Sequence, residues 1–191
     1  FVWYELCTND LDGAKAFYGK LFGWTATPFQ GEGAPDYQIW EMAGKGVGGL
    51  MPLPEGMPKP FWLGYVGVAD ADAAIEKATK AGANVHRVMD IPNVGRIAMV
   101  ADPQGAPFYV MTPATQGDQQ SDVFSTDRAQ HVRWNELSTS DPDAALDFYN
   151  SHFGWAQEGD MDMGEMGKYR FIQHGPTTIG AIMRKPPQLP V

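Results

Sequence analysis

Residues 3–24 read WYELCTNDLDGAKAFYGKLFGW, and residues 134–155 read WNELSTSDPDAALDFYNSHFGW. The two stretches align without gaps at a shift of 131 and share 12 of 22 residues. The similarity continues at a shift of 132, where Tyr37 aligns with Tyr169 and Gly48 aligns with Gly180. Self-similarity at one long spacing indicates an internal repeat. Residues 1–60 and 131–191 are therefore interpreted as two copies of one unit.

Each copy predicts a strand, a helix and three further strands. A β-rich segment comes first, and it is followed by an aspartate suited to cap a helix and by apolar residues at helical spacing. The capping residues are Asp10 and Asp141, and Gly23 and Gly154 are expected to end the two helices. Residues 61–113 predict the same order of elements, with Asp70 as the cap, although they share little sequence identity with the other two units.

The three units predict tandem modules of an α+β fold. Residues 1–60 and 61–113 are expected to pair into one complete module, residues 114–130 form a polar linker, and residues 131–191 form the first half of a second module. A sheet with one apolar face needs a covering partner. We therefore expect either a fourth unit beyond Val191 or a neighbouring chain, which favours association into a homo-oligomer. A protein of three units is the alternative.

Composition excludes several classes of function. The chain has 14 Lys and Arg against 23 Asp and Glu, with a net charge of −9, and it lacks the basic runs that bind nucleic acid. Its single cysteine, Cys7, excludes an internal disulfide and cysteine-based zinc clusters. No apolar run approaches the roughly 20 residues of a membrane helix, and no signal peptide is evident. These features predict a cytoplasmic protein that binds neither nucleic acid nor membranes.

Two paired strand-helix-strand-strand-strand units resemble the vicinal oxygen chelate superfamily, which includes glyoxalase I, bleomycin-resistance proteins and extradiol dioxygenases. The resemblance rests on Phe17-Tyr18 with Phe22-Gly23-Trp24, on their copies in residues 148–155, and on the turn at residues 102–105 before a final strand. It implies a cupped mixed sheet of eight strands, with helices on its outer face. It also implies a ligand in the cup, often beside a divalent metal.

The resemblance places four metal ligands in the cup, on the first and fourth strands of each unit. In this sequence those positions carry residues that are not ordinary divalent-metal ligands: Trp3, Gly49, Leu63 and Tyr109, with Trp134 in the second copy. The histidines are also poorly placed to replace them: His86, His131, His152 and His174. We therefore expect no metal cofactor at the usual positions, although ligands at shifted positions leave a divalent metal open.

Two glutamates are the candidate polar groups of the cup. Strand alternation places Glu5 on the same face as Trp3 and Cys7, and Glu136 on the matching face of the second copy. A desolvated carboxylate of this kind could have a raised pKa and act as a general base, or it could be held by structural hydrogen bonds. Cys7 is expected to be a buried, unreactive thiol.

Aromatic residues predict the walls of the same cup. Those assigned to ligand binding are Trp3, Trp40, Tyr65, Tyr109 and Trp134, and Trp62 is a further candidate. Packing in the core is the alternative for each of them. On the helices, Phe17, Tyr18, Phe148 and Tyr149 are expected to pack against the sheets.

The sequence thus favours a glyoxalase-like protein that binds a small molecule in an aromatic cup, with Glu5 as polar anchor and Glu136 as its equivalent. Two alternatives stay open. One is an enzyme of the glyoxalase or dioxygenase type that uses a non-standard metal site or Glu5 as general base. The other is a non-catalytic interaction protein whose cups are filled by side chains.

Overall fold

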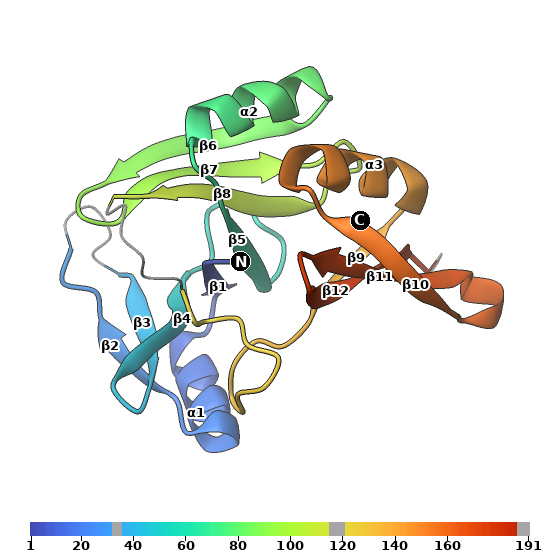
Figure 1. Ribbon diagram of the computed structural model, residues 1–191. Helices are drawn as coiled ribbons and strands as arrows, with labels where there is room; N and C mark the ends of the chain where they lie inside the picture. The colour runs from blue at the N-terminus through green and yellow to red at the C-terminus, as the bar shows by residue number, and fades with distance from the viewer. Residues whose placement is uncertain (32–35, 115–120, 187–191) are drawn as a thin grey trace.

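The structure is a computed structural model that describes residues 1–31, 36–114 and 121–186 (Figure 1). Part of the predicted linker, residues 115–120, and the end of the third unit, residues 187–191, lie outside the described residues. Three times, a strand and a helix are followed by three more strands, with one short 3₁₀ helix, η1, in the last unit. The elements are β1 (Trp3–Thr8), α1 (Leu11–Phe22), β2 (Thr25–Pro28), β3 (Gln38–Met42), β4 (Lys45–Pro52), β5 (Phe61–Gly67), α2 (Ala71–Lys80), β6 (Asn84–Ile91), β7 (Gly95–Ala101), β8 (Pro107–Pro113), β9 (Asn135–Thr139), α3 (Pro142–Phe153), β10 (Ala156–Asp162), η1 (Gly164–Met166), β11 (Lys168–His174) and β12 (Thr177–Arg184).

The first eight strands form a single mixed sheet in the order β2-β3-β4-β1-β5-β8-β7-β6. Within each unit the first strand runs parallel to the fourth, as β1 with β4 and β5 with β8. The two units join where β1 and β5 pair antiparallel, with Trp3 opposite Tyr65 and Glu5 opposite Leu63. The predicted α+β fold with a large mixed sheet is confirmed.

The last four strands form a separate sheet in the order β10-β11-β12-β9, which lies beside the first (Figure 1). Its strand β9 corresponds to β1 and pairs parallel with β12, as β1 does with β4. Whereas β1 also pairs with β5, the other edge of β9 has no partner strand within the described part of the chain. The Tyr4 hydroxyl donates to Asn135 Oδ1 across 2.8 Å, so the first and third units touch at equivalent positions.

The helix boundaries follow from local capping chemistry. The side chains of Asp10, Asp70 and Asp141 each accept a hydrogen bond from the backbone N–H three residues later. Gly23 and Gly154 adopt the left-handed conformation, with φ of 71° and 67°, and end α1 and α3 as predicted. No helix in the described ranges combines the length and apolar character needed to span a membrane.

One core cluster crosses the boundary between the two sheets. It joins Val66, Val100 and Phe108 of the second unit to Phe148 and Tyr149 of α3. The helices α2 and α3 accordingly lie close together, with α2 over β6–β8 of the first sheet and α3 over the second sheet (Figure 1). The Tyr149 hydroxyl donates to Oδ2 of the fully buried Asp102 across 3.0 Å. The third unit is thus fixed to the second by apolar burial and by a buried polar contact.

The repeated Phe-Tyr pair is buried in only one of its two copies. Phe148 and Tyr149 are 5% and 7% exposed, as predicted, but Phe17 is 59% exposed. The prediction that Phe17 packs against a sheet is therefore wrong. The cause is tertiary: the face of α3 lies on the second unit, whereas α1 directs the equivalent side chain away from its own sheet.

Candidate functional site

The inner face of the eight-stranded sheet gathers side chains from β1, β5 and β8. A core cluster on this face holds Leu63, Tyr65, Ile97 and Tyr109, with Trp3 packed against it. Because Tyr65 and Tyr109 are opposite each other in the β5–β8 register, their rings stack at a centroid distance of 4.3 Å. Three of the predicted ligand-binding aromatics are therefore brought together: Trp3, Tyr65 and Tyr109.

Glu5 lies at the centre of this inner face and is only 2% exposed. Its Oε2 accepts a hydrogen bond from the Tyr65 hydroxyl at 2.7 Å, and its Oε1 accepts from Cys7 Sγ at 3.6 Å. No salt bridge to Glu5 occurs within the described residues. Burial raises the pKa of the Glu5 carboxyl, and the hydrogen bonds from Tyr65, Cys7 and Tyr37 oppose that rise only in part.

Tyr37 is a member of this network that sequence analysis missed. Its hydroxyl accepts from Trp3 Nε1 at 2.8 Å and is hydrogen-bonded to Glu5. Burial, followed by the nearby Glu5 charge, raises the pKa of the Tyr37 phenol, so it stays protonated and can donate. The recurrence of Tyr37 as Tyr169 was the signal in the sequence that could have identified it.

The third unit repeats the same arrangement on the equivalent face. Trp134 Nε1 donates to the Tyr169 hydroxyl at 2.6 Å, and that hydroxyl donates to Glu136 Oε2 at 2.7 Å. Here the group is open, because Trp134 is 40% exposed and Glu136 is also exposed. The structure therefore contains two Trp-Tyr-Glu triads: Trp3-Tyr37-Glu5, which is closed, and Trp134-Tyr169-Glu136, which is open.

Trp40 does not belong to the inner face, and its assignment to the ligand-binding wall is corrected. It is fully buried on the opposite face of the sheet, in a cluster with Leu6, Trp24 and Leu50 that packs against α1. Strand alternation explains the difference, because Ile39 and not Trp40 shares the face of Glu5. Trp62 is likewise on the helix-bearing side, where its Nε1 donates to the Tyr18 hydroxyl at 2.9 Å.

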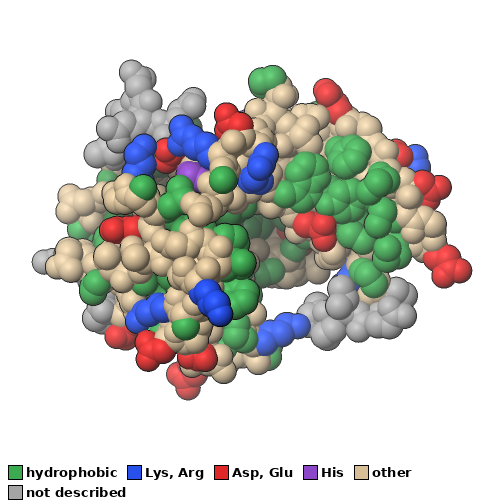
Figure 2. Space-filling view, turned by 90° about the horizontal axis from the view of Figure 1, so that it is seen from below, with side chains coloured by type: hydrophobic (Ala, Val, Ile, Leu, Met, Phe, Trp, Pro, Cys, Tyr) green, Lys and Arg blue, Asp and Glu red, His purple; other side chains and the backbone are tan. Residues whose placement is uncertain are grey.

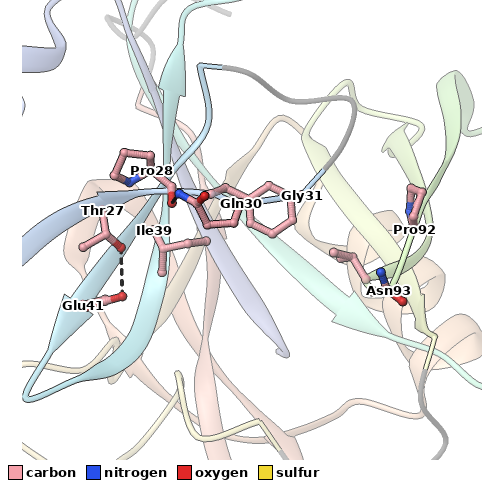
Figure 3. Close-up of a pocket in the computed structure, with 10 residues that line it drawn as sticks. Thr27, Pro28, Gln30, Gly31, Ile39, Glu41, Pro92 and Asn93 are labelled. Carbon is pink, nitrogen blue, oxygen red and sulfur yellow. Dashed lines mark hydrogen bonds between the residues drawn. The ribbon is translucent and has the colours of Figure 1, made fainter.

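A cavity of about 550 Å³ opens at the rim of the inner face. One wall comes from β2, β3 and the segment after β2, and includes Thr27, Phe29, Ile39 and Glu41. The opposite wall is the β6–β7 turn at residues 92–94 (Figure 3). The Thr27 hydroxyl donates to Glu41 Oε1 at 2.9 Å, so the cavity has one carboxylate in a lining that mixes polar and apolar side chains.

The inner face does not offer a conventional site for a divalent metal. The positions carried over from the family hold an indole, a glycine, an isobutyl group and a stacked phenol, at Trp3, Gly49, Leu63 and Tyr109. Glu5, a carboxylate on the same face but not at one of these positions, already accepts hydrogen bonds on both of its oxygens. In the part of the chain that the structure describes, no three His, Cys, Asp or Glu side chains gather as a ligand set.

Comparison with known proteins agrees with this architecture. The sequence profile of the Glyoxalase/Bleomycin resistance protein/Dioxygenase superfamily matches residues 1–110. The chain belongs to this superfamily. It is 32% identical over 190 residues to the Mycobacterium bovis protein named "Putative glyoxylase CFP32", covering 96% of this chain and 70% of that protein. It is 33% identical over 183 residues to the anthracycline biosynthesis protein DauV of Streptomyces sp. strain C5, covering 87% of this chain and 63% of DauV.

Solved structures of superfamily members share the fold. The Mn(II)-bound glyoxalase from Novosphingobium aromaticivorans superposes with a TM-score of 0.67 at 18% identity, over 97% of this chain and 61% of that chain. A variant of homoprotocatechuate 2,3-dioxygenase from B. fuscum gives a TM-score of 0.68 at 17% identity, over 96% of this chain and 52% of that chain. This superfamily member thus spans about half of the dioxygenase chain.

Proposed function

We propose that this superfamily member binds a small organic molecule at the rim of its cup, without a divalent metal at the positions that the family resemblance indicates. The observation that carries the proposal is the cavity of about 550 Å³, whose lining residue Phe29 packs against Tyr37 of the closed triad at a ring-centroid distance of 5.9 Å. Its volume is within the range of ordinary ligand pockets. The inner end of the cup is filled by Trp3, Tyr37 and the Tyr65–Tyr109 stack, so the ligand lies against this filled floor.

The mixed lining of the cavity suits a planar ligand that combines an apolar ring system with hydroxyl groups. Phe29, Ile39 and Pro92 offer apolar contact, and the Glu41 carboxylate offers a strong acceptor. The name of the relative DauV, an anthracycline biosynthesis protein, supports a fused-ring phenol as ligand. We propose a hydroxyanthraquinone-like compound whose hydroxyl group donates to Glu41.

An enzymatic role through Glu5 is the second candidate. The buried carboxyl with its raised pKa is the kind of group that serves as a general base. At 2% exposure it meets a substrate only if Tyr37 or Tyr65 moves aside. If this role holds, Glu5→Gln abolishes turnover while the fold remains intact. If it does not, the variant binds ligand as the wild type does.

The test is a titration with alizarin, a dihydroxyanthraquinone, followed by calorimetry and thermal unfolding. We expect a saturable rise in Tm and a Glu41→Gln variant that binds about tenfold more weakly, because one charge-assisted hydrogen bond is lost. Glu158→Gln, which removes an exposed carboxylate from β10, is the matched control. No binding by alizarin or by simple catechols would overturn the proposal in favour of a filled, non-catalytic cup.

Elemental analysis of protein purified without chelators tests the metal. About one equivalent of a divalent ion that survives dialysis would contradict the metal-free proposal. It would place the glyoxalase or dioxygenase type of chemistry first.

A further inference from the structure

The cavity at the rim of the cup lies between the two edges of the eight-stranded sheet. One wall belongs to the β2–β3 region of the first unit, and the other is the β6–β7 turn of the second unit (Figure 3). In the order of the strands, β2 and β6 are at opposite ends of the sheet, so its curvature brings distant parts of the chain to one cavity. A molecule in this cavity therefore contacts both units at once.

The carboxylate on the first wall has spare hydrogen-bonding capacity. Glu41 Oε1 accepts from the Thr27 hydroxyl at 2.9 Å, whereas Glu41 Oε2 has no hydrogen bond and no ion pair with any described residue. An ionised carboxylate accepts hydrogen bonds and donates none. The ligand atom beside Glu41 must therefore carry a hydrogen, as a hydroxyl group does.

The second wall offers a donor. Of the three turn residues that line the cavity, Pro92, Asn93 and Val94, only Asn93 has a polar side chain. Within the described ranges its carboxamide forms no hydrogen bond with another residue. Its two N–H donors can hold a carbonyl oxygen, which Glu41 cannot.

The backbone holds Asn93 in a fixed place at this wall. The Val94 N–H donates to the Ile91 carbonyl at 3.0 Å and closes the turn, while the Ala114 N–H donates to the Val94 carbonyl at 3.0 Å and ties the turn to the end of β8. Asn93 is left-handed, with a φ of 62°, a conformation that asparagine and glycine tolerate best. Because the backbone is fixed, a ligand has to order only the side-chain torsions of Asn93.

We propose that the ligand carries two polar groups on opposite edges of its ring system, a hydroxyl that donates to Glu41 and a carbonyl that accepts from the Asn93 carboxamide. This inference rests on the proposed function and specifies its ligand as a hydroxyquinone, as distinct from a phenol of the same shape. The rings lie between Phe29 and Ile39 on one side and Val94 on the other. Asn93 is thus the residue that determines specificity for the carbonyl.

A second hollow in the molecule is a competing place for a flat aromatic compound. It lies between the two sheets, has a volume of about 780 Å³ and is lined by aromatic side chains that include Trp24, Trp62 and Phe108 (Figure 2). Neither Glu41 nor Asn93 is part of its lining. Binding there depends on apolar contact and does not respond to changes at those two residues, so polar variants distinguish the two places.

The test compares two probes of similar ring shape by equilibrium dialysis. The first, 2-hydroxyanthraquinone, has a hydroxyl and two carbonyls, whereas the second, 2-anthrol, has the hydroxyl alone. We expect the wild type to bind the quinone about fivefold more tightly, as one net hydrogen bond allows. Asn93→Gly should weaken the quinone about fivefold and the anthrol less than about twofold, because only the quinone loses a hydrogen bond. Glycine adopts the left-handed conformation without strain, so the turn is kept.

Two further variants control for the turn itself. Asn93→Asp keeps the size of the side chain but removes its N–H donors, so it should weaken the quinone at least as much as Asn93→Gly does. Ala43→Gly places a glycine at another left-handed turn position, with a φ of 50°, outside the lining of the cavity. It should leave the affinity for each probe within about a factor of two.

The outcomes separate this inference from the proposed function. If Glu41→Gln weakens both probes but Asn93→Gly affects them equally or not at all, the role of Asn93 is overturned and the cavity remains the binding site. If neither probe binds, or if binding ignores Glu41→Gln as well, the proposed function fails and this inference fails with it.

Discussion

The phenolic oxygen of Tyr37 occupies the space that a side chain at Gly49 would need. A Cβ built on Gly49 would lie 1.8 Å from that oxygen and 3.2 Å from Trp3 Nε1. The family resemblance places a metal ligand at position 49, and in this protein a tyrosine from the preceding segment fills that volume. The Trp3-Tyr37 hydrogen bond thus depends on the absence of a side chain at Gly49.

Gly49→Ala should therefore destabilise the protein by about 1–3 kcal/mol, which is typical of overpacking a filled interior. The added methyl group must displace Tyr37 and break its hydrogen bond with Trp3. Urea unfolding of Gly49→Ala, Tyr37→Phe and the double variant measures the effect. The double variant should lose less unfolding free energy than the two single variants lose together. Strictly additive losses would show that the side chains at positions 49 and 37 do not share this space.

Glu5→Gln should change how stability depends on pH. Burial raises the pKa of the Glu5 carboxyl in the native state above its value in the unfolded chain. At pH values between the native and the unfolded pKa, the carboxyl is protonated in the native state and ionised in the unfolded chain. The stabilisation that this proton gives the native state is complete below the unfolded pKa and is lost as pH rises through the native pKa. The free energy of unfolding of the wild type, relative to Glu5→Gln, should therefore fall as pH rises from the unfolded-state pKa of about 4.5 through the raised native pKa.

Urea unfolding at several pH values checks this, with Glu136→Gln as control, because its exposed carboxylate belongs to the equivalent triad. If the difference in unfolding free energy between the wild type and Glu5→Gln stays constant over this pH range, the buried carboxyl has the same pKa in the folded and unfolded states.

Phe148→Ala and Phe17→Ala form a matched pair from equivalent repeat positions. Phe148 is 5% exposed in the shared core, so its truncation should cost about 3–5 kcal/mol. Phe17 is 59% exposed, so its truncation should alter stability by no more than about 0.5 kcal/mol. Chemical denaturation of both variants gives the comparison. Equal losses would mean that α1 is covered as α3 is.

Tyr149→Phe should cost about 1–3 kcal/mol, because it leaves Oδ2 of the fully buried Asp102 without its donor. Tyr18→Phe is the control from the equivalent position. Its hydroxyl accepts a hydrogen bond from the partly exposed Trp62, whose N–H can bond to water instead. We therefore expect a loss of stability below about 0.5 kcal/mol. Thermal unfolding monitored by tryptophan fluorescence distinguishes the two.

The fold was predictable because the signals for its elements are local. Asp10 and Asp141 mark where helices begin, and Gly23 and Gly154 mark where they end, without reference to the rest of the chain. The site was predictable only where alternation along one strand decides it, as for Trp3 and Glu5. The inclusion of Trp40 was wrong, because the face it occupies depends on how β3 aligns with β4.

The role of Tyr37 and the exposure of Phe17 needed tertiary information. Tyr37 precedes β3 and reaches the inner face only through the space left by Gly49. Phe17 and Phe148 are the same residue in the same local sequence, and only the second unit, packed on α3, separates their environments. The repeat identified which residues correspond, but it could not show which of two corresponding residues is buried by a neighbouring unit.

The two Trp-Tyr-Glu triads give this chain an internal standard. Any property of the carboxylate at position 136, such as its reactivity toward a carbodiimide, its isotope-shifted infrared band or its response to salt, can be read against a chemically identical group at position 5 in the same tube. Temperature, buffer and protein concentration cancel in that ratio. What remains is the effect of enclosure together with the two donors, Cys7 and Tyr65, that Glu5 has and Glu136 lacks.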